Sequence, residues 1–260
     1  MDLQLNSSRF LICGASSGFG KAIAEMLLSE NAECILTARR GDLLDKEFGS
    51  RYSNRVKIIE GDLTDPPLID KLAETAAEKT LHGVVFNAGG PPMGTPLETT
   101  DMELWDDAYQ LVMRWKIRLA LRLAPLMTDK NYGRMLFIES KSVKEPIPTL
   151  VLSNAFRAGV VGFAKSLARE IADTGVTVNV LAPGSHDTPA IGRVLKKISE
   201  TEGISLEQAR KKSESTVPVG RMGTGEEIAG LAAWLLSPLS GFVTGQTISH
   251  DGGSISGIFG

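Results

Sequence analysis

The chain has 260 residues, of which 42% are hydrophobic, and a formal net charge of −3. This size allows one large α/β core, and no Lys/Arg run is long enough to form a nucleic-acid-binding arm. The polar residues 1–6 do not resemble a signal peptide, and no apolar run approaches the ~20 residues that span a bilayer. We therefore expect a cytoplasmic protein without nucleic-acid or membrane partners.

Seven short apolar runs alternate with helical segments along the chain. The predicted strands are Phe10–Cys13, Glu33–Thr37, Val56–Ile59, Gly83–Phe86, Met135–Ile138, Val176–Leu181 and Thr247–Ser249. Apolar strands separated by helices indicate a parallel sheet that is covered on both faces. We predict an α/β fold of the Rossmann-like type, a doubly wound parallel sheet in a single domain over residues 1–260.

Helix starts are marked by capping residues. Asp65 precedes Pro66, which predicts an N-cap followed by proline in the first turn. The spacing of a capping box recurs at Thr100–Glu103, Ser205–Gln208 and Thr224–Glu227. Residues 189–218 carry both signs of charge, which is typical of a solvated helical face.

Cysteine and histidine usage does not predict a metal site. Cys13 and Cys34 fall in strand-like segments, where buried thiols are the simplest interpretation. The histidines are far apart in sequence and none belongs to a ligand motif, so no metal residues are expected.

A glycine-rich turn follows the first strand and leads into a helix. Gly14 permits the tight turn, Gly18 lets the backbone approach phosphates, and Gly20 allows close helix packing. The helix N-terminus supplies amide donors and partial positive charge. This arrangement is suited to a dinucleotide pyrophosphate.

Together with Asn87-Ala88-Gly89, Pro183-Gly184 with Thr188, and the segment 251–253, this turn resembles the short-chain dehydrogenase/reductase family over about residues 8–255. The resemblance implies that Asp62 and Leu63 flank the adenine, and that the Pro-Gly loop holds the nicotinamide. The residues expected to bind the cofactor are Gly14, Ser16, Ser17, Gly18, Phe19, Gly20, Arg39, Arg40, Asp62, Leu63, Asn87, Ala88, Gly89, Arg157, Pro183, Gly184 and Thr188.

The end of the second strand favours NADP over NAD. An acidic residue there would bind the ribose 2′-hydroxyl, whereas Arg39 and Arg40 suit a 2′-phosphate. Two observations leave NAD open: Ser17 stands where many NADP-preferring relatives carry a basic residue, and either arginine is also compatible with a solvated surface position.

The reaction centre departs from the family pattern. The family places a tyrosine thirteen residues after its serine and a lysine four residues later; counted from Ser140, these positions hold Ser153 and Arg157. Val112 stands where a helix asparagine is expected. A serine hydroxyl is far less acidic than a phenol, and a guanidinium does not relay a proton as an ammonium does.

Another group must then supply the proton if the chain is catalytic. Lys144 lies on the loop that borders the substrate in the family, and desolvation there would let it donate near neutral pH. Lys141 and His186 are weaker candidates, and all three are also compatible with surface roles. The candidate catalytic residues are Ser140, Lys144, Ser153 and Arg157.

Two functions fit this sequence. The first is an NAD(P)-dependent oxidoreductase that transfers a hydride between the nicotinamide and a carbonyl or alcohol, a small-molecule substrate. The second is a catalytically silent NADP(H)-binding sensor or interaction protein. The resemblance further implies that residues 189–218 form a substrate lid and that the predicted helix Trp105–Met127 pairs subunits in a homotetramer or dimer; the alternative is a monomer with an unusually basic helix face.

Overall fold

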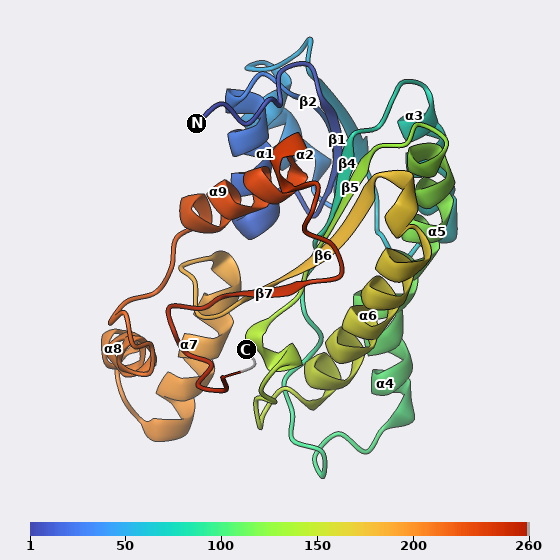
Figure 1. The fold of residues 1–260 in the computed structure, drawn as a ribbon. Helices are drawn as coiled ribbons and strands as arrows, with labels where there is room; N and C mark the ends of the chain where they lie inside the picture. The colour runs from blue at the N-terminus through green and yellow to red at the C-terminus, as the bar shows by residue number, and fades with distance from the viewer. Residues whose placement is uncertain (259–260) are drawn as a thin grey trace.

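One parallel sheet of seven strands organises residues 1–258, which are the residues that the computed structural model describes (Figure 1). Its strand order is β3-β2-β1-β4-β5-β6-β7, so the winding reverses between β1 and β4. The predicted strands are confirmed, with ends that shift by at most two residues. The strands are β1 (Arg9–Cys13), β2 (Glu33–Ala38), β3 (Val56–Glu60), β4 (Gly83–Phe86), β5 (Gly133–Ile138), β6 (Val176–Pro183) and β7 (Thr247–His250).

Helices cover both faces of the sheet, which confirms the predicted Rossmann-like α/β fold in a single domain (Figure 1). Successive strand residues point to opposite faces, so Leu11 packs in one core and Ile12 in the other. This double burial explains why the strands are continuous apolar runs. One face carries α1 (Gly18–Ser29), α2 (Gly41–Leu44) and α9 (Gly225–Leu236), and the other carries α3 (Pro66–Ala77), α5 (Trp115–Thr128) and α6 (Val151–Glu170).

The helix starts agree with the sequence except at α4 (Met102–Tyr109). Capping boxes form at Ser205 and Thr224, as their spacing predicts. The predicted box at Thr100 is wrong: Asp101 is the N-cap, and its carboxylate accepts from the Glu103 amide. The carboxylate is the better partner because it is charged and the helix N-terminus carries partial positive charge.

The predicted helix Trp105–Met127 is interrupted. A π-helical turn, Gln110–Arg114, joins α4 to α5, and Val112 is buried within it. The pair α7 (Pro189–Glu202) and α8 (Leu206–Ser215) packs together beyond the sheet edge, at the lower left of Figure 1. Within residues 1–258, no helix is long and apolar enough to cross a bilayer.

Candidate functional site

The predicted site residues gather where the parallel strands end. Gly14 follows β1, Arg39 follows β2, Asn87 follows β4, and Ser140 comes two residues after β5. All these carboxyl ends lie at one edge of the sheet, beside the reversal between β1 and β4. Doubly wound folds bind their ligands at this place.

The glycine turn is braced by the neighbouring strand. Gly14 has φ +65°, and a Cβ at this position would lie 2.6 Å from the carbonyl oxygen of Asn87. The Asn87 side chain donates from Nδ2 to the carbonyl oxygens of Cys13 (3.4 Å) and Gly14 (3.3 Å). The close approach of the two backbones therefore requires a glycine at position 14, and the two bracing hydrogen bonds require a side-chain amide at position 87.

A cavity of about 390 Å³ opens over the start of α1. The glycine turn forms one wall and the segment around Thr188 forms the other. A Cβ on Gly18 would lie 3.8 Å from the Thr188 Cβ, so two predicted regions meet here although they are far apart in sequence. The lining residues are Ser16, Ser17, Gly18, Lys21, Ala22, Glu25, Asp187, Thr188, Pro189 and Gly225.

The two arginines after β2 have different surroundings. Arg40 donates from Nη2 to the hydroxyl oxygens of Ser16 and Ser17, at 3.2 Å each. Arg39 is 75% exposed and lies 3.9 Å from Asp62. Asp62 also accepts from the amide and hydroxyl of Thr64, which closes a local turn. Arg40 is therefore the arginine that is held against the glycine turn.

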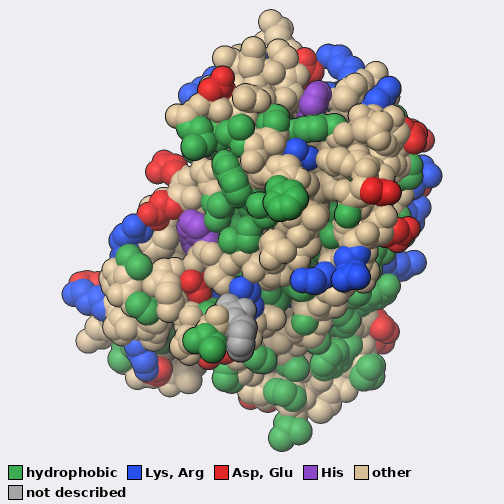
Figure 2. Space-filling model, viewed as in Figure 1, with side chains coloured by type: hydrophobic (Ala, Val, Ile, Leu, Met, Phe, Trp, Pro, Cys, Tyr) green, Lys and Arg blue, Asp and Glu red, His purple; other side chains and the backbone are tan. Residues whose placement is uncertain are grey.

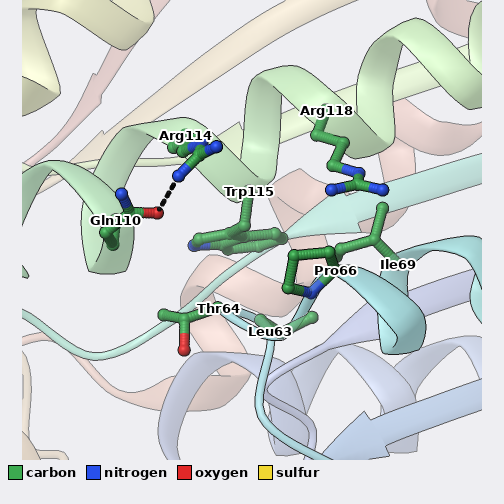
Figure 3. A pocket seen from close by; sticks show the side chains of 8 residues that line it. All are labelled: Leu63, Thr64, Pro66, Ile69, Gln110, Arg114, Trp115 and Arg118. Carbon is green, nitrogen blue, oxygen red and sulfur yellow. Dashed lines mark hydrogen bonds between the residues drawn. The ribbon is translucent and has the colours of Figure 1, made fainter.

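Leu63 lies against the π-helical turn Gln110–Arg114 and the start of α5 (Figure 3). Leu63, the indole ring of Trp115 and the Pro66 ring enclose a cavity of about 20 Å³. Beside this cavity, Gln110 accepts a hydrogen bond from Arg114. This volume is close to that needed by one water molecule, so the cavity does not hold an adenine ring.

The Pro-Gly loop after β6 is fixed by the last strand. His186 is buried; its Nδ1 lies 3.1 Å from the Gly184 carbonyl oxygen and its Nε2 lies 2.9 Å from Nδ1 of His250. The Phe19 ring meets the His186 ring edge-on at 5.1 Å. Burial lowers the pKa of His186, and both ring nitrogens already have partners. The arrangement does not favour His186 as the proton donor.

The segment after β4 lies at the same edge of the sheet, between the ends of β1 and β5. Ala88 is half-buried and Gly89 is exposed, with no atom within 4 Å of the place its Cβ would take. Pro183 ends β6 and is buried. The backbone at Gly89 therefore leaves free space beside it, as a segment that lines a cofactor requires.

Two of the candidate catalytic residues lie on the loop after β5. Ser140 is half-buried and caps a short 3-10 turn, Lys141–Val143, by accepting from the Ser142 amide at 3.2 Å. Lys144 is half-buried at the end of this turn. The other two, Ser153 and Arg157, lie one turn apart on α6, and both are buried.

A buried chain of charged groups lies beneath these residues. Arg157 donates from Nε to Ser153 Oγ and from Nη1 to Glu139 Oε2, at 2.9 Å each. The other carboxylate oxygen of Glu139 lies 2.5 Å from Lys116 Nζ. The side chains of Lys116 and Glu139 are 1% and 0% exposed. Burial lowers the pKa of Lys116 to about 8; the charge of Glu139 raises it and that of Arg157 lowers it further.

The sequence did not predict Lys116 or Glu139 as site residues. The interpretation of an unusually basic helix face is wrong for Lys116, because this side chain points into the core. Helical spacing was the available signal, since Lys116 lies one turn from Val112 and from Leu119 and Ala120, which are all buried. Glu139 directly follows a fully buried strand and is itself buried, which is an equally unusual position for a carboxylate.

Stability alone does not account for these charges. Removal of an ion from water costs several kcal/mol, and replacement of a buried ion pair by apolar groups is often neutral or stabilising. Charged groups buried at the ligand-binding edge of a sheet are candidates for a functional role.

These residues fit a dinucleotide. The left-handed turn at Gly14, the open backbone at Gly18 and the N-terminus of α1 provide a phosphate cradle. Arg40 with Ser16 and Ser17 provides donors suited to a 2′-phosphate. Among residues 1–258, no cluster of three or more His, Cys, Asp or Glu side chains could hold a metal ion.

Comparison with known proteins agrees with this geometry. The sequence model of the family described as enoyl-(acyl carrier protein) reductase matches residues 14–254. The chain is 32% identical over 246 residues to 3-oxoacyl-(acyl-carrier-protein) reductase FabG of Salmonella typhimurium, which covers 94% of this chain and 95% of that protein. The chain therefore belongs to the short-chain dehydrogenase/reductase family.

Solved structures show the same architecture. An actinorhodin polyketide ketoreductase with NADPH matches with a TM-score of 0.90 and 30% identity, covering 96% of this chain and 98% of that one. The L-sorbose reductase from Gluconobacter frateurii, complexed with NADPH and L-sorbose, matches with a TM-score of 0.91 and 26% identity, covering 99% and 100%.

Proposed function

We propose that this protein reduces a carbonyl compound with NADPH through an atypical reaction centre, in which Ser153 and Arg157 take the places of the family's tyrosine and lysine. The protein is an NAD(P)-dependent oxidoreductase of the short-chain type, and its cofactor is NADP. A catalytically silent sensor is not favoured. The bound cofactor supplies the hydride; the residues of the chain hold it and polarise the substrate.

The observation that carries this proposal is the cavity between the glycine turn and Thr188. It joins the phosphate cradle of α1 to the Pro-Gly loop, and Arg40 lies at the turn with Ser16 and Ser17. The 2′-phosphate at the end of β2, the phosphates at the end of β1 and the nicotinamide at the end of β6 would then follow one another along the sheet edge, in the order that the cofactor requires.

Proton delivery is assigned to the loop after β5. Lys144, with Ser140 and Ser153, would polarise the substrate oxygen and give it a proton. The three residues come from two elements, the β5 loop and α6, which pack against each other. A positioned acid accelerates such reactions by about 10²–10⁴-fold.

The substrate is expected to be a small, partly apolar carbonyl compound. The names of the relatives indicate different carbonyl substrates. One is a 3-oxoacyl group on an acyl carrier protein, and another is L-sorbose. An apolar substrate mouth formed by Met93, Ile147 and Leu150 would favour the less polar class. Residues 189–218 are proposed as the lid, and Arg210 ties α8 to the Pro-Gly loop through Asp187 at 2.7 Å.

Single-turnover spectroscopy tests this function. NADPH absorbance at 340 nm would be followed with cyclohexanone, benzaldehyde, L-sorbose and ethyl acetoacetate. Stoichiometric loss of absorbance with at least one of them is expected. Tight NADPH binding without oxidation by any of them would contradict the proposal and support the silent alternative.

The oligomer and the cellular location belong to the same proposal. Met102 on α4 and Leu121 on α5 are 67% and 56% exposed, and apolar side chains are scattered over the region of α4 and α6 in Figure 2. These apolar surfaces favour a homodimer or homotetramer over a monomer, and a cytoplasmic setting suits the expected cofactor. Sedimentation at micromolar concentration decides the oligomeric state.

A further inference from the structure

The Arg157 guanidinium is held on two of its three nitrogens. Its Nε donates to Ser153 Oγ and its Nη1 donates to Glu139. The third nitrogen, Nη2, lies 3.6 Å from the place that a Cβ on Gly90 would take, beside the segment after β4. The inner edge of the guanidinium is therefore fixed, and Nη2 faces the expected cofactor wall.

Ser153 accepts the Nε–H of Arg157, so one lone pair of its oxygen is occupied. Within residues 1–258, no acceptor receives the Ser153 hydroxyl proton. A serine in this state can donate its proton in a hydrogen bond to an added ligand oxygen. The hydrogen bond from Arg157 thus determines the direction in which the Ser153 hydroxyl can donate its proton.

Lys116 holds the other end of the buried row of charged groups formed by Arg157, Glu139 and Lys116. It holds Oε1 of Glu139, while Arg157 holds Oε2. With Lys116 and Arg157 protonated and Glu139 ionised, the group carries one net positive charge. Cys13, from β1, interacts electrostatically with Lys116, but burial raises the pKa of its thiol so that it stays neutral.

We propose that Lys116 and Glu139 are positioning residues of the reaction centre, which hold Arg157 so that Ser153 donates to the substrate oxygen and one positive charge lies beneath it. The inference rests on the proposed reductase function. Neither residue touches the substrate. Their part is to place Arg157 and Ser153 and to stabilise the negative charge that develops on oxygen.

The reaction balances with groups already assigned. Hydride, with its electron pair, forms the new C–H bond at the carbonyl carbon, which is reduced while the cofactor is oxidised. The C=O π pair moves to oxygen, and this oxygen takes a proton from the Lys144 ammonium. The resulting amine recovers a proton from solvent water.

The charge of this group changes with pH in a defined direction. Lys116 has a pKa of about 8, so it is protonated below this pH and neutral above it. The net charge beneath the substrate oxygen falls from one to zero as the pH rises through about 8. Turnover should therefore decline above about pH 8.

The decisive variant is Lys116→Met, with Lys165→Met as control because Lys165 is exposed on α6. The Glu139–Arg157 pair survives in K116M, so the protein should fold. For the best-reduced carbonyl compound of the four named above, kcat should fall about 10- to 100-fold in K116M while the NADPH Kd stays within twofold. The decline above about pH 8 should be absent in K116M and present in K165M.

A readout without turnover comes from the cofactor-free protein. NMR of ¹³C-lysine-labelled wild type should show one lysine that titrates near pH 8, and K116M should lack this signal. Glu139→Gln, with exposed Glu170→Gln as control, should release Arg157 from Ser153 in a crystal structure. If E139Q does not fold, K116M alone decides.

The possible failures are distinct. Equal kcat in K116M and K165M, or an unchanged pH decline in K116M, overturns this inference while the reductase function stands. Wild-type protein that binds NADPH and reduces none of the four compounds overturns the proposed function, and this inference with it.

Discussion

Asn87 donates from its side-chain nitrogen to the carbonyl oxygen of Gly14 at 3.3 Å, and this bond joins the end of β4 to the turn after β1. The contact lies at the reversal of the sheet, where the two halves of the fold meet. The geometry of the glycine turn therefore depends on β4 as well as on its own sequence.

Gly14→Ala should unfold the protein more easily than Gly18→Ala. Both residues have positive φ, which costs an alanine roughly 1–2 kcal/mol. Only at Gly14 does the new Cβ also lie 2.6 Å from a backbone oxygen, whereas at Gly18 the nearest atom is 3.8 Å away. We expect a loss of about 3 kcal/mol or more in G14A and about 1–2 kcal/mol in G18A. Urea unfolding of both variants measures this, and equal losses would contradict it.

Arg40→Ala should weaken NADPH binding specifically. A charge-assisted hydrogen bond contributes roughly 1.5–3 kcal/mol, so the NADPH Kd should rise about 10- to 150-fold while the NADH Kd changes little. Arg39→Ala is the matched control, because Arg39 is exposed and pairs loosely with Asp62. Fluorescence titration with both cofactors provides the measurement. A larger effect in R39A than in R40A would assign the 2′-phosphate to the other arginine.

Lys144→Met should abolish turnover and leave cofactor affinity intact. Lys144 is the proposed proton donor, and loss of a positioned acid lowers kcat by about 10²–10⁴-fold. Lys141→Met, at the start of the same 3-10 turn, serves as the control. Stopped-flow oxidation of NADPH follows both variants. Unchanged turnover in K144M would remove Lys144 from the reaction.

The stability of the wild type should rise relative to K116M as the medium becomes alkaline. Lys116 has a pKa of about 8 in the folded protein, against 10.5 for the ordinary side chain. Between these values the unfolded chain binds a proton that the folded protein has released, so the free energy of unfolding increases with pH. The difference should grow by up to about 3 kcal/mol between pH 8 and 10.5. Guanidinium unfolding at several pH values checks this, and a pH-independent difference would contradict it.

Much of the fold could be predicted because its determinants are local. Apolar runs of three to six residues separated by helical segments specify a buried parallel sheet, and the Ser205 and Thr224 boxes specify helix starts. The error at Thr100 has a local cause as well, because Asp101 is adjacent and offers a charged cap.

The buried charges could not be placed in this way. Lys116 stands in a basic run, and a solvated position is the ordinary one for such a side chain. Its burial depends on Glu139, which comes from another element 23 residues away. The π-helical turn before α5 likewise depends on packing that no local pattern reports.

The partnership of His186 with His250 also bears on biosynthesis. The imidazole that anchors the Pro-Gly loop has its partner on β7, 64 residues later in the sequence. A nascent polypeptide that already displays the glycine turn therefore lacks this support until residue 250 has been synthesised. Ribosome-stalled chains ending before residue 247 should leave the loop protease-sensitive, whereas released chains that contain β7 should resist cleavage there.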